Sequence, residues 1–488
     1  MLCRAHTLDI SAHYWLKYLR LEYRRLALEI DTCILKNWIK SIDITGIKLS
    51  NVVFDKYLNT AGNERLGQFK ITALSNKMIP STLTEISKFL TKDVMEKAHQ
   101  LRTNSQDNVA QLKVTRAAPA GEGLMSAVYR IHVTGHQYST TFVVKGLVSD
   151  LLLRRTLDCA KYFKREADFF TEILPVLIEM QTSLGAKERI QNHIPTCYGC
   201  HQDGFNDYIL LEDLSESKCE SICRTPIKEE KDRALNTLAH LHAVSMALRI
   251  KRPEKFTEIA SSIPEVYINE ENRDWYKIYL ANALDIDRKV VAELEDTDSI
   301  YFKRFHELLT KDIYGENIAL VSTWGDHPVL CHGDAWSPNF LNSSDRMVMI
   351  DFQLSRCASP ATDLAYWIML CSNHTTVTQD FLDAVEVYYS SIQHYLKDMG
   401  LEASKVFSRE ALDDELKQYG KFGFLSCLTS LPLMTADRCD TLNSMGEKFP
   451  GVDKIPLESL WQVTPLKNTE HKLRLMKAVR VAVDVGLI

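Results

Sequence analysis

The sequence contains no run of apolar residues long enough to cross a membrane. A membrane-spanning helix needs about 18 consecutive apolar residues, whereas the longest apolar stretches, such as residues 364–371, are only long enough for a core helix. Residues 1–17 lack a continuous apolar segment followed by a small-residue cleavage site, which a secretion signal would need. Internal repeats and low-complexity tracts are also missing from the sequence. We therefore expect a cytoplasmic protein without a transmembrane segment.

Strong charge of one sign is likewise missing. The chain carries 58 Lys and Arg against 64 Asp and Glu, a formal charge of −6, so the overall balance favours neither nucleic acid nor an anionic membrane as a partner. The twelve cysteines are scattered, and in a reducing compartment such residues are mostly small buried hydrophobic groups. Residues 197–201 contain the Cys-x-x-Cys-His string used for haem attachment, but that chemistry requires export. We expect a turn with two packed thiols there.

The first 80 residues differ in charge from the rest. They hold 12 Lys and Arg against 7 Asp and Glu, a charge of +5, which leaves −11 for the remainder. Within residues 14–40, apolar residues at helical spacing are interspersed with basic ones, a pattern that could contact a membrane or a partner. Such a segment more often packs on its own domain, so we predict no membrane contact. On this interpretation residues 1–82 form a basic helical extension of unknown role.

From residue 83 onward, the pattern predicts a small sheet followed by a larger helical region. The expected elements are a helix at 84–100; strands at 111–115, 127–133 and 140–147; a helix at 159–180; a strand at 208–211; helices at 228–248, 272–294 and 299–309; strands at 329–332 and 347–351; and helices at 360–371, 379–399 and 409–431. The first three strands are typical of an antiparallel meander. We predict an α+β fold with two lobes, the first over residues 83–214 and the second over residues 215–488.

The strongest chemical signal is a pair of short motifs in the second lobe. Residues 332–339 are His-Gly-Asp-Ala-Trp-Ser-Pro-Asn, and residues 347–352 form an apolar strand that ends in Asp-Phe. A carboxylate, an Asn five positions later and an Asp at a strand end reproduce the spacing of kinase catalytic and metal-binding segments. Either string alone fits an ordinary turn or strand end, but their order and spacing together favour phosphoryl transfer.

Phosphoryl transfer mainly requires positioning and charge neutralisation, so each residue of these motifs has an expected role. Asp334 would accept the proton of the acceptor hydroxyl as the catalytic base. Asn339 and Asp351 would supply the hard oxygen ligands that Mg²⁺ prefers, with Asp351 joining the metal to the phosphates. His332 is expected to brace the loop rather than to take part in the chemistry.

Contacts to the phosphates of ATP are expected from the first lobe. Gly121, Gly123 and Ser126 lie between two predicted strands, where a flexible turn could cover phosphates with backbone N–H groups, although two glycines in a hairpin are more often only a turn. Lys145 ends an apolar strand, where a solvated lysine would be usual. Glu166 lies beside the apolar stripe of a helix, where a carboxylate needs a partner. A Lys145–Glu166 pair that holds the α- and β-phosphates satisfies both residues.

Other residues carry weaker signals. Glu212 and Leu214 follow an apolar strand, and backbone groups of this segment are expected to bind adenine. His240 and His242 are two apart on a predicted helix and face different directions, so we expect helix-packing or surface residues rather than metal ligands. Asp363 is expected either to stabilise a helix N-terminus or to anchor the catalytic loop by hydrogen bonds.

Together these motifs resemble the ecdysteroid kinase-like family. The resemblance covers roughly residues 83–430 and rests on residues 163–175, 211–214, 238–245, 332–339, 350–353 and 359–364. That family belongs with choline kinases and aminoglycoside phosphotransferases, so the resemblance implies a protein-kinase-like fold with a small antiparallel-sheet lobe and a larger helical lobe. It also implies ATP, Mg²⁺ and a small hydroxylated acceptor, such as an ecdysteroid, another steroid or a xenobiotic alcohol.

The sequence departs from the family pattern at two places. Pro338 stands where a second Asn is usual, and residues 219–224 replace a glycine-containing turn, so both changes bear on the acceptor pocket or the loop geometry. The predicted function is an ATP-dependent small-molecule O-kinase, a monomer with no nucleic acid partner. A catalytically inactive pseudokinase is the alternative, against which all the polar site residues are present. A protein kinase fits less well because no clear Ala-Pro-Glu segment follows Asp351.

Overall fold

The computed structural model describes residues 82–117, 125–223, 225–371, 377–434 and 448–488. All of them belong to one compact unit of the chain, Ser75–Ile488. The basic helix expected within residues 14–40 lies outside the described residues, so the extension over residues 1–82 and the boundary between the two lobes stay predictions. In the part of the chain that is described, no helix is both long enough and apolar enough to span a membrane.

A five-stranded sheet forms the first part of the described chain. Its strands lie in the order β1-β2-β3-β5-β4, and each neighbouring pair is antiparallel. The strands are β1 (Val109–Arg116), β2 (Ser126–Gly135), β3 (Ser139–Leu147), β4 (Cys197–His201) and β5 (Tyr208–Glu212). The antiparallel meander expected from the sequence is therefore confirmed.

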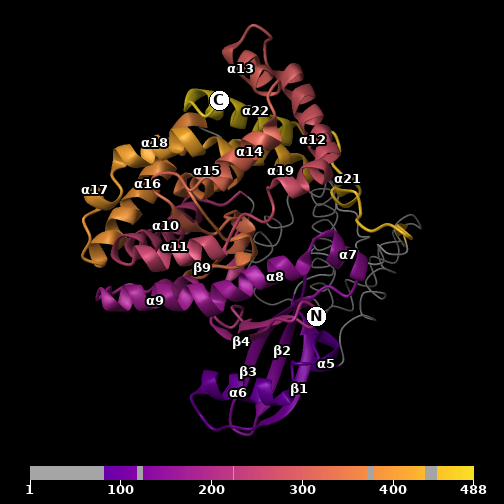
Figure 1. Ribbon diagram of the computed structural model, residues 1–488, viewed down its shortest axis with the longest axis vertical. Coiled ribbons are helices and arrows are strands. Elements are labelled where there is room, and N and C mark those ends of the chain that lie inside the picture. Colours follow the sequence, from indigo (N-terminus) through magenta and orange to yellow (C-terminus); the bar gives the residue numbers. More distant parts are fainter. Residues whose placement is uncertain (1–81, 118–124, 224, 372–376, 435–447) are drawn as a thin grey trace, which may run out of the picture. The chain divides into compact units, whose positions relative to one another are not determined.

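One face of this sheet is covered by α6 (Lys92–Thr103), as Figure 1 shows. Side chains alternate between the faces of a strand, so Phe142 and Val144 of β3 reach the same small core as Met95 of the helix. Asp107, just after α6, is buried and accepts hydrogen bonds from the backbone N–H groups of residues 136–138 in the β2–β3 turn. The helix and the hairpin are thereby held together.

The Cys-x-x-Cys-His string is not a turn, as the sequence had suggested, but the edge strand β4. It pairs with β5, and the register shifts at Gly199, where a missing side chain tolerates a bulge. The actual turn follows it, where the buried Asp207 accepts hydrogen bonds from the N–H groups of Asp203 and Gly204. The residues that mark the turn in the sequence are therefore Asp203 and Gly204. The residues before them are extended because their backbone pairs with β5.

The remainder of the described chain is mainly helical, which confirms the predicted α+β class. Its helices, with those before it, are α5 (Leu83–Ile86), α7 (Leu151–Thr156), α8 (Cys159–Asp168), α9 (Leu174–Ser183), α10 (Lys228–Lys251), α11 (Pro253–Ser262), α12 (Arg273–Leu294), α13 (Ile300–Leu308), α14 (Ile313–Ser322), α15 (Pro360–Cys371), α16 (Val377–Asp398), α17 (Ala403–Val406), α18 (Arg409–Tyr419), α19 (Lys421–Met434), α21 (Leu457–Leu460) and α22 (Thr469–Asp484). Short strands lie among them: β6 (Glu220–Ser221), β7 (Val329–Cys331), β8 (Phe340–Asn342), β9 (Met347–Met349) and β10 (Arg356–Ala358).

Three helices predicted from the sequence are interrupted in the structure. The helix expected at 84–100 divides into α5 and α6, which are separated by residues 87–91. The helix expected at 159–180 divides into α8, a π-helical turn η2 (Phe169–Ile173) and α9, which has Pro175 at its start. Because proline has no N–H group and fits the first helical turn, it marks this restart. The helix expected at 409–431 divides at Gly420 into α18 and α19. Helices α7, α11, α14, α17, α21 and α22 and strands β6, β8 and β10 were not predicted, and β4 was expected as a turn.

Helix α15 is the scaffold on which the site is built. All but one of its twelve residues are buried, so it is apolar on nearly every face. Helix α19 lies directly against it, because Gly423 has no side chain: a Cβ there would be 2.3 Å from the carbonyl carbon of Ala365. This close contact fixes α15, the helix that carries Asp363 and Tyr366, against α19.

Candidate active site

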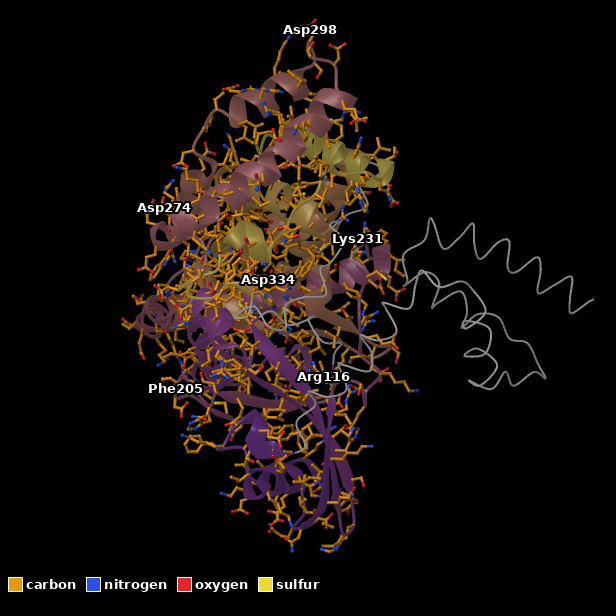
Figure 2. All side chains as sticks on the ribbon, turned by 90° about the vertical axis from the view of Figure 1, so that its right-hand side faces the viewer. Arg116, Phe205, Lys231, Asp274, Asp298 and Asp334 are labelled. Atoms are coloured by element: carbon orange, nitrogen blue, oxygen red, sulfur yellow. The ribbon has the colours of Figure 1, made fainter. Side chains whose placement is uncertain are left out.

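Four of the predicted site residues lie near the ends of three strands and on helix α8. Strand β3 carries Lys145, α8 carries Glu166, and short strands precede Asp334 and Asp351. In Figure 2 Asp334 lies where the helices meet the sheet. Residues that are up to 206 positions apart in the sequence are brought into direct contact here.

Lys145 is held between two carboxylates. Its Nζ lies 2.7 and 2.9 Å from the two oxygens of Glu166 and 2.8 Å from Oδ1 of Asp351. Burial lowers the pKa of this ammonium, but the negative charges of Asp351 and Glu166 outweigh burial and raise it above its ordinary value. Lys145 is therefore a buried, charged lysine, not the solvated strand-end residue that was the alternative.

Asp351 is fixed by its own backbone and by the residue that follows it. Its φ of +71° lies in the left-handed region, which is uncommon for a residue with a side chain and is frequent at functional sites. Phe352 then stacks on Phe169 of η2 with ring centroids 3.7 Å apart, and it contacts Phe170 edge-on. The π-helical turn thus receives the Phe of the Asp-Phe pair and sets where Asp351 lies.

The loop that carries Asp334 is held through its backbone by Asp363 of α15. The carboxylate of Asp363 accepts hydrogen bonds from the N–H groups of His332, at 2.6 Å, and Gly333, at 3.1 Å. Gly333 has a φ of +85°, and a Cβ there would lie 1.8 Å from the carbonyl oxygen of Leu354, so only glycine fits. Of the two structural roles expected for Asp363, loop anchoring is the one that these contacts support.

His332 joins the two motifs. Its Nε2 donates to the carbonyl of Ile350 at 3.0 Å, and its Nδ1 accepts from the N–H of Asp334 at 3.3 Å. Burial lowers the pKa of this histidine, so the ring is neutral and makes both bonds at once. A bracing role rather than a chemical one agrees with this arrangement.

Asp334 is surrounded by neutral hydrogen-bond donors. Asn339 Nδ2 lies 2.9 Å from Oδ2, and the hydroxyl of Tyr366 donates to Oδ1 at 3.1 Å. Burial and then the charge of Asp351 raise the pKa of Asp334 to about 7. The carboxyl group is thus both held in orientation and able to exchange a proton near neutral pH.

The orientation of the Asn339 amide follows from its contacts. Its Nδ2 donates to the backbone carbonyl of Asp334 at 3.0 Å as well as to the side chain. Because a carbonyl oxygen only accepts, this end of the amide must be the nitrogen. The amide oxygen therefore points away from Asp334.

The structure gives less support for the residues expected around adenine and the phosphates. Gly121 and Gly123 lie outside the described residues, and Ser126 begins β2 opposite Leu147. The N–H of Glu212 already donates to the carbonyl of Thr196 at 2.8 Å, and its side chain pairs with Arg346. The carbonyl of Leu214 accepts from the N–H of residue 219 at 3.0 Å. Any contact with a base must therefore use other backbone groups of this segment.

Three residues at the site were not singled out from the sequence. Tyr366 lies one helical turn after Asp363 on α15, and this i, i+3 spacing was the signal that could have found it. Asp213 is buried and pairs with Arg130 of β2 at 2.5 Å. Arg356 of β10 donates to the carbonyl of Gly333 at 3.1 Å, and nothing in the sequence marks that contact.

The two histidines of α10 are fully buried in helix packing. His240 stacks on Tyr395 with centroids 3.7 Å apart, while His242 contacts the hydroxyl of Tyr388 at 2.7 Å and Asp363 at 3.3 Å. His242, Asp363 and Cys331 lie close enough together to hold a metal ion. The carboxylate of Asp363 is, however, already used by the backbone of the catalytic loop, so we assign this group to packing.

The two departures from the family pattern contact each other. The hydroxyl of Ser221, in the 219–224 segment, donates to the carbonyl of Pro338 at 3.1 Å. Strand β6 of the same segment pairs with β8, directly after Asn339. The changes thus form one local unit at the side of the catalytic loop.

Comparison with known families decides the identity of the chain. Residues 120–401 match the ecdysteroid kinase-like family, which is more than half of the sequence. The chain belongs to the ecdysteroid kinase-like family. The resemblance drawn from the motifs is thus confirmed, and membership makes the protein a kinase-like phosphotransferase that acts on a hydroxyl group.

Two solved structures illustrate what the chain is similar to. An ethanolamine kinase of Plasmodium vivax has a TM-score of 0.35 and 15% identity, over 76% of this chain and 81% of that one. A choline kinase of Cryptosporidium parvum has a TM-score of 0.37 and 12% identity, over 77% of this chain and 91% of that one. No curated protein matches the sequence.

Proposed function

We propose that this member of the ecdysteroid kinase-like family transfers the γ-phosphoryl group of ATP to a hydroxyl group of a small ecdysteroid-like, steroid or xenobiotic alcohol. One observation carries the proposal: Lys145 contacts both Glu166 and Asp351, and a third carboxylate, Asp334, has a pKa raised to about 7 by burial and by the charge of Asp351. Phosphoryl transfer needs a cation for the phosphates, metal ligands and a base, and these residues supply all three.

In this proposal the polyphosphate of ATP binds at Lys145. Glu166 holds the ammonium group in place by accepting two hydrogen bonds from it, so the cation is directed toward the phosphates without a search over rotamers. The contact between Lys145 and Asp351 places a carboxylate beside the same phosphates. The adenine of ATP would bind beside the segment around Leu214. Gly121, Gly123 and Ser126 would cover the phosphates.

The donor set fits Mg²⁺. The carboxylate of Asp351 and the amide oxygen of Asn339 are hard oxygen ligands, and the amide oxygen points away from Asp334. Mg²⁺ held there would neutralise the charge that develops on the phosphates. A second hydrogen bond holds Asp351, because Gln353 Nε2 donates to its Oδ2 at 3.3 Å.

Asp334 orients the acceptor hydroxyl and takes its proton. As the hydroxyl oxygen bonds to the γ-phosphorus, the bond from that phosphorus to the β–γ bridging oxygen breaks, ADP leaves, and the hydroxyl proton passes to Asp334. Asn339 and Tyr366 hold the two carboxylate oxygens, so the base does not rotate away from the acceptor.

The test is a product assay with purified full-length protein, ATP and Mg²⁺. A panel of steroid, choline-like and xenobiotic alcohols would be incubated and analysed by mass spectrometry, with Asp334→Asn as the control. A product that gains one phosphate, and that the variant does not form, supports the proposal and names the acceptor class.

Two negative outcomes are separated by measuring the binding of Mg·ATP to the same sample. Binding without any product would favour a pseudokinase that holds nucleotide or ligand without transferring phosphate. No binding would contradict the proposed nucleotide site itself.

A further inference from the structure

Helix α8 carries Glu166, and the position of this helix decides whether that carboxylate reaches Lys145. The helix lies between the sheet and the helical region, as Figure 1 shows. The residue before Glu166 is Arg165, which has no role in the steps described above. Its side chain is buried, with 6% of the residue exposed, and an arginine is seldom buried this deeply unless it has partners. The partners of its guanidinium group therefore indicate why it is buried.

Arg165 joins α8 to two separate segments of the chain. Its Nη1 donates to the carbonyl of Ser355, and its Nη2 donates to the carbonyl of Pro264 at 2.8 Å. Ser355 follows η6 (Phe352–Leu354), the turn that begins directly after Asp351. Pro264 lies between α11 and α12. A single side chain thus bonds the backbone of the metal-binding segment and the backbone of the helical region.

Two further contacts reach the same two segments. The hydroxyl of Tyr162, also on α8, donates to the carbonyl of Val266 at 3.4 Å, close in sequence to Pro264. Phe169 of η2 stacks on Phe352 with ring centroids 3.7 Å apart. Each segment is therefore held at two points, and α8 cannot turn about its axis without breaking at least one of these contacts.

The segment that Arg165 contacts also touches the catalytic loop. The hydroxyl of Ser355 donates to the carbonyl of His332 at 3.4 Å. Arg356 donates to the carbonyl of Gly333 at 3.1 Å. Arg165 therefore lies at the junction between the helix that holds the phosphate-binding lysine and the segments that carry the metal ligand and the base.

Arg165 keeps its charge in this buried position. Burial lowers the pKa of its guanidinium, and the negative charge of Glu265, which also pairs with Arg356 at 3.5 Å, acts in the opposite direction. An arginine stays protonated throughout the physiological pH range. Its hydrogen bonds to the two carbonyls therefore have a charged donor, which makes them stronger than bonds between neutral groups.

We propose that Arg165 is a positioning residue for phosphoryl transfer: it fixes α8 to the turn after Asp351, so that Glu166 holds Lys145 where the phosphates of ATP bind. The inference rests on the proposed function and adds the residue that sets the position of α8. Arg165 acts through Glu166 and does not itself bind the phosphates. A displacement of about 1 Å can cost about a hundredfold in a site of this kind, so a residue away from the reacting groups can control it.

Equilibrium binding of Mg·ATP to the purified full-length protein tests the inference without an acceptor. Arg165→Met removes both hydrogen bonds and keeps most of the apolar stem. Arg165→Lys keeps the charge but lacks the planar fork that bonds both carbonyls. Arg249→Met is the matched control, because it removes a guanidinium that joins a different helix, α10, to a backbone carbonyl, that of Asp326 at 3.3 Å.

Arg165→Met should lose about tenfold in Mg·ATP affinity, and Arg165→Lys about threefold, because the lysine can retain one of the two bonds. Arg249→Met should stay within about twofold of the wild type, although denaturant should unfold it more easily too. Equal losses of affinity in Arg165→Met and Arg249→Met would mean a general effect of lost packing and would overturn the inference.

A double-mutant cycle with Glu166→Ala shows whether Arg165 acts through Glu166. Adding Arg165→Met to Glu166→Ala should lower the affinity by no more than about twofold, because the carboxylate that α8 positions is already absent. Losses that add in full would overturn the positioning role. Should denaturant unfolding show that Arg165→Met is not folded, Arg165→Lys decides in the same cycle, and a wild-type affinity in that variant would overturn the inference.

The wild type separates this inference from the proposed function. A wild type that does not bind Mg·ATP would overturn the proposed function and the role of Arg165 with it. A wild type and a folded Arg165→Met that bind Mg·ATP equally well would overturn the role of Arg165 alone.

Discussion

Two carboxylates of the site, Asp351 and Asp334, stand in opposite surroundings. Asp351 contacts a buried, charged lysine at 2.8 Å, whereas Asp334 is contacted by a phenol and an amide and by no cation among the residues that the structure describes. Burial and the neighbouring charge of Asp351 accordingly raise the pKa of Asp334 to about 7. The difference separates two tasks: one carboxylate pairs with a cation, and the other can gain and lose a proton.

The surroundings also differ in how they are built. Around Asp351, ion pairs join Lys145 of β3 to Glu166 of α8 and to Asp351 itself. Removing one of these charges therefore leaves another without its partner. The Asp334 side is held by backbone hydrogen bonds to Asp363 and by the fit of one glycine. Substitutions around Asp351 and around Asp334 should therefore have different effects on stability and turnover, and the following variants test this difference.

The largest effect is expected from Asp334→Asn. Loss of a general base lowers turnover by about a thousandfold, whereas the affinity for Mg·ATP should stay within a few-fold, because the Lys145 side is untouched. The measurement is kcat together with a nucleotide titration. Asp345→Asn is the matched control, since this exposed aspartate lies in the same loop region and should keep full turnover. Comparable losses in both variants would remove the special role of Asp334.

The same variant has an opposite effect on stability. Because the pKa of Asp334 in the folded state, about 7, exceeds the ordinary value of 3.8, its contribution to stability is present at low pH and is lost as pH rises through 7. Asp334→Asn should therefore unfold at a higher denaturant concentration than the wild type at pH 8. At pH 4 the two proteins should be equal, and a difference of the same size at both pH values would contradict the assignment.

Lys145→Met should disrupt the ion pairs around Asp351. It leaves the buried carboxylate of Glu166 and the partly exposed carboxylate of Asp351 without their cation, which costs about 3–5 kcal/mol of the free energy of unfolding. Mg·ATP binding should weaken at the same time. The double variant Lys145→Met/Glu166→Gln should recover part of the stability, because one unpaired charge is removed, but none of the nucleotide affinity. Denaturant unfolding and nucleotide titration give the two readouts, and a double variant no more stable than Lys145→Met would argue against the ion pair.

The sequence predicted the charged side of the site better than the neutral side. Lys145 and Glu166 were paired in advance because a carboxylate beside an apolar stripe needs a partner, and that logic depends on residue type alone. Tyr366 was missed because a tyrosine in an apolar helix is an ordinary core residue until the helix is placed. Arg356 and Glu265 were missed because their partners are a backbone carbonyl and each other, which no spacing in the sequence reveals.

The fold shows a similar division. The meander β1 to β3 and most long helices follow from periodicity, but α8 and α9 were predicted as one helix because the π-helical turn between them does not interrupt the apolar stripe. That turn holds Phe352 and therefore sets the position of Asp351. Local sequence patterns therefore predict most helices and strands, whereas the positions of the site residues depend on contacts between these elements.

Gly333→Ala tests whether Asp334 depends on backbone fit. A Cβ at this position would lie 1.8 Å from the carbonyl of Leu354, so the loop must shift, and overpacking of this kind costs about 1–3 kcal/mol beyond the strain of the left-handed backbone. Gly400→Ala is the matched control, because it has a φ of +69° with nothing within 4 Å. Turnover should fall about a hundredfold in the first variant only. Equal losses of stability in both would mean that the contact with Leu354 is relieved without moving the loop.

The smallest effect is expected from Tyr366→Phe. Its hydroxyl donates to Asp334 and so favours the charged carboxylate, which means that removing it raises the pKa of the base further. Since the base must be deprotonated, kcat/KM of the wild type should rise with pH through about 7, and in the variant this limb should move upward by about half a pH unit to one unit. A plot of kcat/KM against pH gives the result, with Tyr395→Phe expected to keep the wild-type profile. An unchanged profile with a lowered plateau would instead mean that Tyr366 positions the acceptor and leaves the proton of Asp334 unaffected.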